Sequence, residues 1–194
     1  SAQDGDVIPV KGTIATTELK ANGKSIIIQG MSDDATIDIT SDDKYSDCGG
    51  NITFKNLTIK MASDRNHYDV GLHNQGGTHV YDDCKFEGIA TAWGDCTYNN
   101  CEFTNETSGK YAAWVYDGTV VYNNCTFTGV NRAAKVFNEN ANSNLNVTYN
   151  NCTFKATTPD SRASSNKAAV EVDVTNNTNV ATIVTINNPT IENM

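Results

Sequence analysis

The chain has 194 residues, a formal charge of −9 at pH 7 and a pI of about 4.6, and its length fits one domain with a sizeable core. Its 14 lysines and arginines are scattered and form no basic stretch, which argues against a nucleic-acid partner. The longest purely aliphatic run, Ile26–Ile28, is too short to cross a bilayer, so we expect no transmembrane segment.

The chain opens on SAQDGD without a recognisable signal peptide, a start that fits a mature protein whose export signal has been removed. Asn, Thr, Asp and Val are abundant. Thr and Val favour strands, whereas Asn and Asp favour turns. The composition therefore predicts an all-β protein with many short strands, and we expect it to be secreted or displayed at the cell surface.

A short motif recurs from Asn51 onward. Its six copies are NITFKNLTI (51–59), THVYDDCKF (78–86), DCTYNNCEF (95–103), TVVYNNCTF (119–127), NVTYNNCTF (146–154) and IVTINNPTI (183–191). Successive copies lie 17 to 37 residues apart. A fixed motif at variable spacing predicts a constant structural rung with loops of different lengths between rungs.

Each copy holds two short strands, separated by a pair of Asn or Asp residues in five copies and by Lys55–Asn56 in the first. In the fourth copy, alternation places Val120 and Tyr122 on one side of the first strand, and Cys125 and Phe127 on one side of the second. Asn and Asp tolerate the left-handed backbone conformation of a sharp bend. We therefore interpret Tyr, Cys and Phe as core residues, and the Asn pairs as bends whose amides form hydrogen-bonded ladders.

A third strand precedes several of the motifs. Its copies are residues 70–72, 112–115, 133–136 and 168–174. Three short strands per repeat, joined by bends, wind into a coil, and stacked coils pair each strand in parallel with its copies. The pattern predicts a single right-handed parallel β-helix of about seven coils, spanning residues 1–194.

The Asn-bearing bend between two short strands, together with the segment GTIATTELKANGKSIIIQGMSDDATIDI (12–39), resembles the pectate lyase-like superfamily of β-helix repeat proteins, which includes adhesin-like members. The resemblance implies that a short amphipathic segment caps the first coil. Residues 16–22, followed by Gly23, fit such a cap. The expected organisation is an N-terminal cap over residues 1–25 and coils over residues 26–194.

Four of the six cysteines, Cys84, Cys101, Cys125 and Cys152, occupy the same motif position and are expected to lie one above another. Buried free Cys behaves as a small apolar residue, so we favour a reduced interior column. Disulfides between neighbouring coils remain an alternative, although parallel side chains suit the bond's dihedral angle poorly. The cysteine spacing gives no zinc motif, and we predict no metal site.

The outward positions of the third strand place aromatic side chains in one column: His73, Trp93, Trp114, Tyr116 and Phe137. Polar residues expected nearby are Asp69, Asn74, Asp95, Asp117, Asn138 and Glu139. Exposed aromatic rings on a rigid sheet suggest a contact surface, and rings of this kind stack on sugars. The resemblance implies the same location, because relatives bind polysaccharide on this face. The alternative is that loops cover these rings.

The resemblance also implies an alternative in which the chain is an enzyme, because pectate lyases hold calcium with clustered carboxylates and use an arginine as the base. The weak catalytic candidates are Asp95, Asp117 and Arg132. No local catalytic motif of the family surrounds them, and no cofactor is required unless calcium is bound. We therefore favour catalysis less than polysaccharide binding.

Three hypotheses follow for function. The first is a secreted or cell-surface module that binds polysaccharide along the aromatic column. The second is a small calcium-dependent polysaccharide lyase or glycoside hydrolase, and the third is the structural stalk of an adhesin. The final strand, NNPTIENM, has no visible cap, which predicts end-to-end self-association or continuation in a longer chain.

Overall fold

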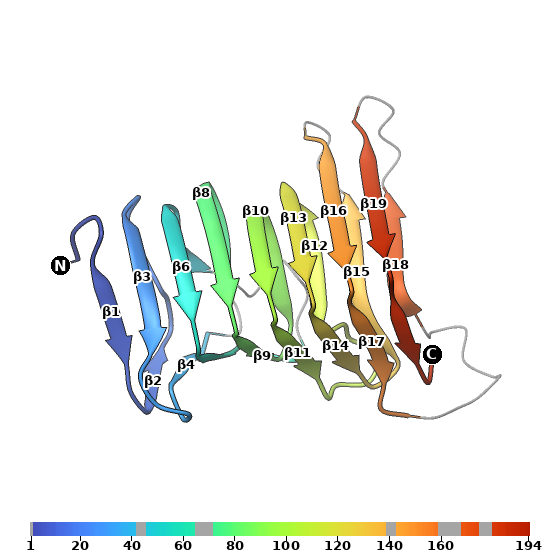
Figure 1. The fold of residues 1–194 in the computed structure, drawn as a ribbon, viewed down its shortest axis with the longest axis horizontal. Helices are drawn as coiled ribbons and strands as arrows, with labels where there is room; N and C mark the ends of the chain where they lie inside the picture. The colour runs from blue at the N-terminus through green and yellow to red at the C-terminus, as the bar shows by residue number, and fades with distance from the viewer. Residues whose placement is uncertain (1, 42–45, 65–71, 139–142, 159–167, 175–179) are drawn as a thin grey trace.

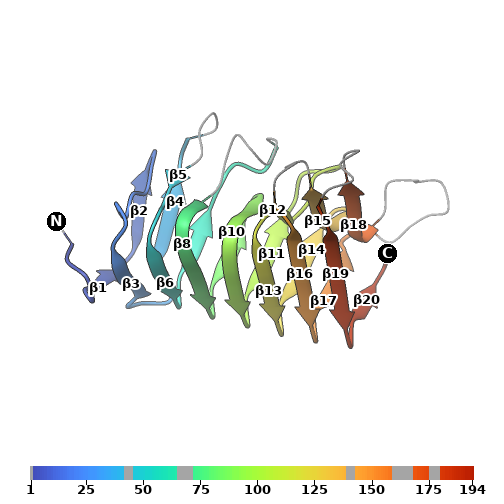
Figure 2. The ribbon, with the colours of Figure 1, turned by 90° about the horizontal axis from the view of Figure 1, so that it is seen from above.

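A computed structural model describes residues 2–41, 46–64, 72–138, 143–158, 168–174 and 180–194. In these residues the chain forms twenty strands in parallel sheets and no helix, so none that is long and apolar enough to span a bilayer. The strands lie side by side along the long axis of the molecule (Figure 1), and the view from above shows the coils stacked in chain order (Figure 2). The predicted parallel β-helix is confirmed.

The coils have three faces. The first face contains β1 (Val7–Val10), β3 (Ser25–Gly30), β6 (Asn51–Lys55), the second halves of β8 (Leu72–Asp82) and β10 (Ala90–Asn99), β13 (Thr119–Asn123), β16 (Leu145–Asn150) and β19 (Thr182–Asn187). The second face contains β2 (Thr13–Thr16), β4 (Thr36–Ile39), β7 (Thr58–Lys60), β9 (Lys85–Glu87), β11 (Glu102–Asn105), β14 (Thr126–Gly129), β17 (Thr153–Ala156) and β20 (Thr190–Glu192). The third face contains β5 (Ser46–Asp47), the first halves of β8 and β10, β12 (Ala113–Asp117), β15 (Arg132–Asn138) and β18 (Ala168–Val174).

The stack begins earlier than the sequence suggested. Within residues 1–25, β1 and β2 already pair in parallel with β3 and β4, so the segment expected to be a cap supplies a coil of its own. The second face consequently has eight strands, one more than the expected number of coils. The segment 17–24 contains no regular secondary structure.

The Asn pairs form the bends between the first and second faces. The second residue at each bend has a positive φ, from 50° at Asn188 to 54° at Asp83 and Asn124, in the left-handed region that Asn and Asp tolerate. From Asp82 and Asp83 to Asn187 and Asn188, these side chains also bond to their copies in the neighbouring coils. Asn123 Nδ2 donates to Asn99 Oδ1 at 2.9 Å, and Asn150 Nδ2 donates to Asn123 Oδ1 at 2.9 Å. The predicted asparagine ladder is therefore present.

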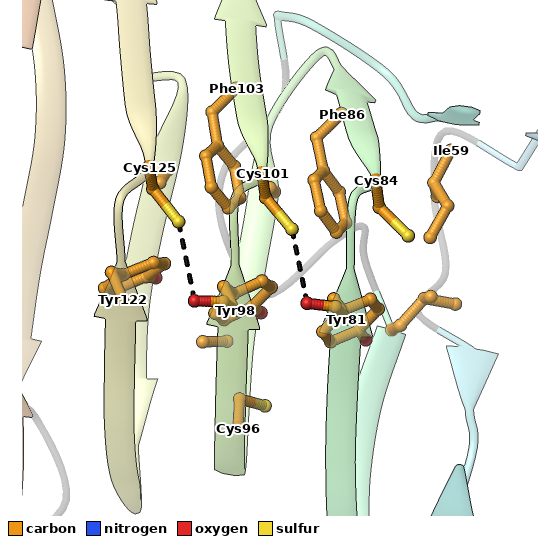
Figure 3. Packing of buried hydrophobic residues seen from close by; sticks show 14 of the residues in the cluster. Ile59, Tyr81, Cys84, Phe86, Cys96, Tyr98, Cys101, Phe103, Tyr122 and Cys125 are labelled. Carbon is orange, nitrogen blue, oxygen red and sulfur yellow. Dashed lines mark hydrogen bonds between the residues drawn. The ribbon is translucent and has the colours of Figure 1, made fainter. Parts of the chain in front are cut away.

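The interior consists of columns of like residues (Figure 3). Tyr98 stacks on Tyr81 and on Tyr122 with ring centroids 4.6 and 4.7 Å apart, close to the spacing of about 4.8 Å between paired strands. Phe103 stacks on Phe127 in the second face at 4.7 Å, and the two columns meet edge to face. Their side chains are at most 2 % exposed. Tyr and Phe of the motif are thus core residues, as predicted.

The six cysteines are buried and none forms a disulfide. Cys101 Sγ donates to the carbonyl oxygen of Tyr81 at 3.4 Å, and Cys125 Sγ donates to that of Tyr98 at 3.5 Å (Figure 3). Burial raises the pKa of Cys96 to about 12. The thiols therefore act as small core residues, and the four in the motif fill the space beside the Asn bend.

Candidate functional site

The third face differs from the other two because its outward side chains do not repeat. Its inward residues are small, and Ala113, Val115, Ala134 and Val136 are at most 1 % exposed. The pairs in register on this face are His73 with Trp93, Thr91 with Trp114, Trp114 with Lys135, Lys135 with Glu171, and Phe137 with Asp173. The structure thus brings all five predicted aromatic residues onto one surface. We call His73, Trp93, Trp114, Tyr116 and Phe137 the aromatic row.

Trp93 lies at the centre of one half of the row. Its ring centroid is 4.3 Å from that of His73 and 4.0 Å from that of Tyr116, on the two neighbouring coils. A β-bulge produces the second contact. Ala92 pairs with Val115 but Trp93 pairs with Asp117, so Tyr116 is the extra residue of β12. Both faces of the Trp93 ring are covered, which leaves its edge toward solvent.

His73 departs from the expectation of an open contact residue. Its side chain is 0 % exposed because Trp93 lies over it. Trp93, Trp114, Tyr116 and Phe137 are half-buried. The row therefore packs partly upon itself: its rings cover one another, whereas the alternative expected loops to cover them, and the outer rim of the row is accessible.

The other half of the row surrounds Lys135. Its Nζ lies 4.9 Å from the ring centroid of Trp114 and 5.2 Å from that of Phe137, within the range of cation–π contacts. The same nitrogen pairs with Glu171 at 3.1 Å and with Asp173 at 3.2 Å, and the Lys135 side chain is only 12 % exposed. Lys135 therefore acts as a fixed cation that joins the rings to two carboxylates.

Tyr111, just before β12, extends this cluster. Its hydroxyl donates to Glu171 Oε2 and accepts a hydrogen bond from Arg132 Nη1 at 3.1 Å. Burial, and then the bond to Glu171, raises the pKa of Tyr111 well above its usual value. Although burial opposes it, hydrogen bonds from Tyr111 and Lys135 lower the pKa of Glu171. The arrangement keeps the phenol protonated and the carboxylate charged. The sequence analysis did not select Tyr111, because it precedes the third strand expected at residues 112–115.

A cleft of about 430 Å³ opens beside Trp93 and is lined by Asn74, Asp95, Asp117 and three glycines. Gly94, one of these glycines, has a φ of 103°, and a Cβ on it would lie 2.3 Å from the carbonyl oxygen of Asn74, so any larger residue would clash with the neighbouring coil. The glycines thus keep backbone accessible next to an aromatic wall.

Each of the two carboxylates in the cleft is held through one of its two oxygens. Asp95 Oδ1 accepts a hydrogen bond from the Thr119 amide at 2.8 Å. Asp117 Oδ1 accepts hydrogen bonds from the Gly118 amide at 2.8 Å and from Ser143 Oγ at 2.7 Å. Among the described residues, neither Oδ2 has a hydrogen-bond partner. Each Asp is therefore oriented, with an acceptor left for a ligand.

Asn74 is 3 % exposed and its Nδ2 donates to the carbonyl oxygens of Gly77 and Asp95, at 2.5 and 3.0 Å. Asn138 is similarly buried, and its Nδ2 donates to Thr182 Oγ1 at 2.7 Å. Of the two amides, only Asn74 lines the cleft. Asp69 and Glu139 lie outside the described residues.

The three weak catalytic candidates separate into two places. Asp95 and Asp117 share the cleft, whereas Arg132 begins β15 beside Tyr111. The backbone between these two ends of the face extends over roughly 20 Å at about 3.3 Å per residue. One catalytic centre containing all three residues does not form. Among the described residues, no three His, Cys, Asp or Glu side chains gather in a way that would hold a metal ion.

Comparisons with protein-family models, with curated proteins and with solved structures give no match for this chain.

Proposed function

We propose that this chain is a secreted or cell-surface module that binds a polysaccharide along the third face, with one sugar residue seated in the cleft beside Trp93. The observation that carries the proposal is the cleft itself, where an aromatic wall adjoins two oriented carboxylates and accessible backbone. Concave sites with an aromatic side and a few fixed polar groups are the usual form of small-ligand sites. Carboxylate oxygens accept strong hydrogen bonds from hydroxyl groups.

Charge narrows the choice of polysaccharide. Asp95 and Asp117 line the cleft, Glu171 and Asp173 lie farther along the same face, and the chain carries a formal charge of −9. A polyuronate would be repelled by these groups, so we expect a neutral polysaccharide. The covered faces of Trp93 favour contact through the ring edge and hydrogen bonds in the cleft over flat stacking on the indole.

The test is a titration of soluble neutral polysaccharides followed by tryptophan fluorescence, since Trp93 lines the cleft. Asp95→Asn keeps the oxygen that holds Thr119 and replaces only the second oxygen. We expect it to weaken binding by about 10- to 100-fold, the range for a lost hydrogen bond to a charged group. Lys60→Met, on the second face, is the control and should bind like the parent. Equal binding by Asp95→Asn and the parent would refute the cleft.

A structural stalk is the second candidate, and the stacking of Trp93 between His73 and Tyr116 favours it. Rings that cover one another stiffen the face without a ligand. No binding across a broad panel of polysaccharides would favour the stalk. Cleavage of a polysaccharide that disappears when calcium is removed would instead support the lyase alternative.

A further inference from the structure

Exposed aliphatic side chains gather at the two ends of the stack. Among the described residues, the large hydrophobic side chains classed as exposed are Val7, Ile14, Met31, Val172, Val174, Ile183, Ile186 and Ile191. Only Met31 lies away from the first and last coils. One coil farther inside the stack, the side chains at the corresponding positions are buried. Tyr149 is 0 % and Phe154 is 1 % exposed, against 42 % for Ile186 and 57 % for Ile191 in the last coil.

Two of the inward columns, one on the first face and one on the second, have the same residue at both ends. The first-face column runs Ile8, Ile28, Phe54, Tyr81, Tyr98, Tyr122, Tyr149, Ile186. The second-face column runs Ile14, Ile37, Ile59, Phe86, Phe103, Phe127, Phe154, Ile191. Each column is aromatic inside and ends in isoleucine. One further step of the same register would place Ile186 on Ile8 and Ile191 on Ile14, aliphatic against aliphatic.

The two ends also match in apolar character and in the hydrogen-bonding groups of their edge strands. At the N-terminal end an apolar cavity of about 570 Å³ is lined by Ile8, Val10, Ile14 and Ile37, among others. β19 and β20 are the last strands of the first and second faces, and β1 and β2 are the first. In a parallel sheet, the outer edge of the last strand presents the groups that the outer edge of the first can pair with.

We propose that a second copy of this chain docks its first coil on the last coil, head to tail, and continues both faces in register. The partner is a second copy because the register, strand direction and residue type of both columns continue across the joint. The contact is heterologous, so it leaves one open end on each side and extends into filaments at high concentration. This inference is independent of the proposed function, since the third face is not required for it.

Two features oppose the contact and set its dependence on conditions. Each copy carries a formal charge of −9, so long-range repulsion is strong at low ionic strength and is screened by salt. In addition, Asp6 comes just before β1, and the register of β1 places it in the inward column that contains Ile26 and, in the last coil, Val184. Head-to-tail docking would therefore bury the carboxylate of Asp6. We therefore expect association to increase with salt, and Asp6→Val to strengthen it by tenfold or more.

Sedimentation equilibrium over a range of concentrations tests the proposal. The parent should show mass increasing with concentration, and more so at high salt. Ile186→Asp/Ile191→Asp blocks one end and Ile14→Asp blocks the other, and each variant alone should be monomeric. Mixed together, they retain one complementary pair of ends and should form dimers but nothing larger. Met31→Asp, at an exposed site away from the ends, should behave like the parent.

Thermal unfolding followed by circular dichroism checks that each variant is folded before it is compared. A parent that stays monomeric at its solubility limit in high salt would overturn the proposal. So would association of the Ile14→Asp variant alone, because that result requires contact between two C-terminal ends. A monomeric mixture of the two blocked variants, with an associating parent, would also overturn it.

Discussion

The motif columns in the interior and the aromatic row on the third face are both built by stacking aromatic side chains between coils, but they differ in repetition. Inside, Tyr81, Tyr98 and Tyr122 follow one another with rings nearly parallel, at interplanar angles of 4° and 11°. On the third face, Trp93 stacks on His73 and Tyr116 at 27° and 33°. A core tolerates only side chains that match their neighbours, whereas an outer surface can vary from coil to coil. Repetition in this chain therefore marks structure, and its loss marks the surface where a function can be located.

The largest expected effect is the protection of the interior cysteine thiols from chemical modification. All six thiols are buried, so a reagent reaches them only when the coil opens. At Cys96, burial also raises the pKa to about 12, so this residue forms little thiolate at pH 8. We expect a disulfide reagent to modify the native thiols at least about a thousandfold more slowly than the same chain in denaturant, because reaction requires opening of the coil. Six thiols should titrate after unfolding. Rapid reaction of the folded chain would place a cysteine outside the core.

Removing a ring should cost far more inside than outside. Phe127→Ala deletes a ring with 0 % exposure and should lower the free energy of unfolding by roughly 3–5 kcal/mol. Phe137→Ala removes a half-buried ring of the aromatic row and should cost about 1 kcal/mol. Urea unfolding of both variants measures the difference. Equal losses would mean that the third face is part of the core and would remove the distinction between the two regions.

The contribution of the Asn bend to stability can be separated into a part from backbone conformation and a part from the hydrogen bonds of the asparagine ladder. Asn124 has a φ of 54° and bonds to Asn100 and Asn151 at 3.3 and 3.2 Å. Asn124→Ala loses both bonds and pays for the left-handed conformation, so we expect a loss of roughly 2 kcal/mol in the free energy of unfolding. Asn124→Gly loses only the bonds and should cost about 1 kcal/mol. Glycine proving worse than alanine would contradict this account of the bend.

One polar residue interrupts an interior column, and its effect should depend on pH. His79 is buried between aliphatic and thiol positions of the first face, with Nε2 at 3.0 Å from the Cys48 carbonyl oxygen and Nδ1 at 3.2 Å from the Tyr81 hydroxyl. Burial lowers the pKa of His79 below 6.5 in the folded chain. The unfolded chain therefore binds a proton first as pH falls, and stability is lost below pH 6.5 until the lowered folded pKa is reached.

The expected slope from this one group is at most about 1.4 kcal/mol per pH unit. His79→Val places in the column the residue found at positions 120 and 147, and should flatten the dependence between pH 5 and 6.5. Unfolding free energies measured by urea across this range, for parent and variant, give the comparison. Parallel curves would show that His79 does not titrate differently in the folded and unfolded chain.

The interior was predictable because its rules are local. The alternation in Val120–Tyr122 and Cys125–Phe127, and the conformational tolerance of Asn124, are properties of a few adjacent residues, and the six copies of the motif showed that they recur from coil to coil. The predicted bends, asparagine ladder and buried Tyr, Cys and Phe columns are all present. The first coil was missed because β1 and β2 lack the motif and differ from it in sequence.

The sequence by itself thus determined the parallel coil, its bends and its inward columns, because a period of two and a left-handed Asn are encoded within single strands. Only the tertiary structure decided which outward residues meet, because that depends on loop length and bulges between coils. The bulge at Tyr116 covers Trp93, Trp93 covers His73, and the turn at Gly94 opens the cleft. Arg132 lies far along the face from Asp117 because β12 and β15 pair in parallel, and Arg132 begins β15 whereas Asp117 ends β12. These contacts join coils that are distant in sequence, so no local pattern records them.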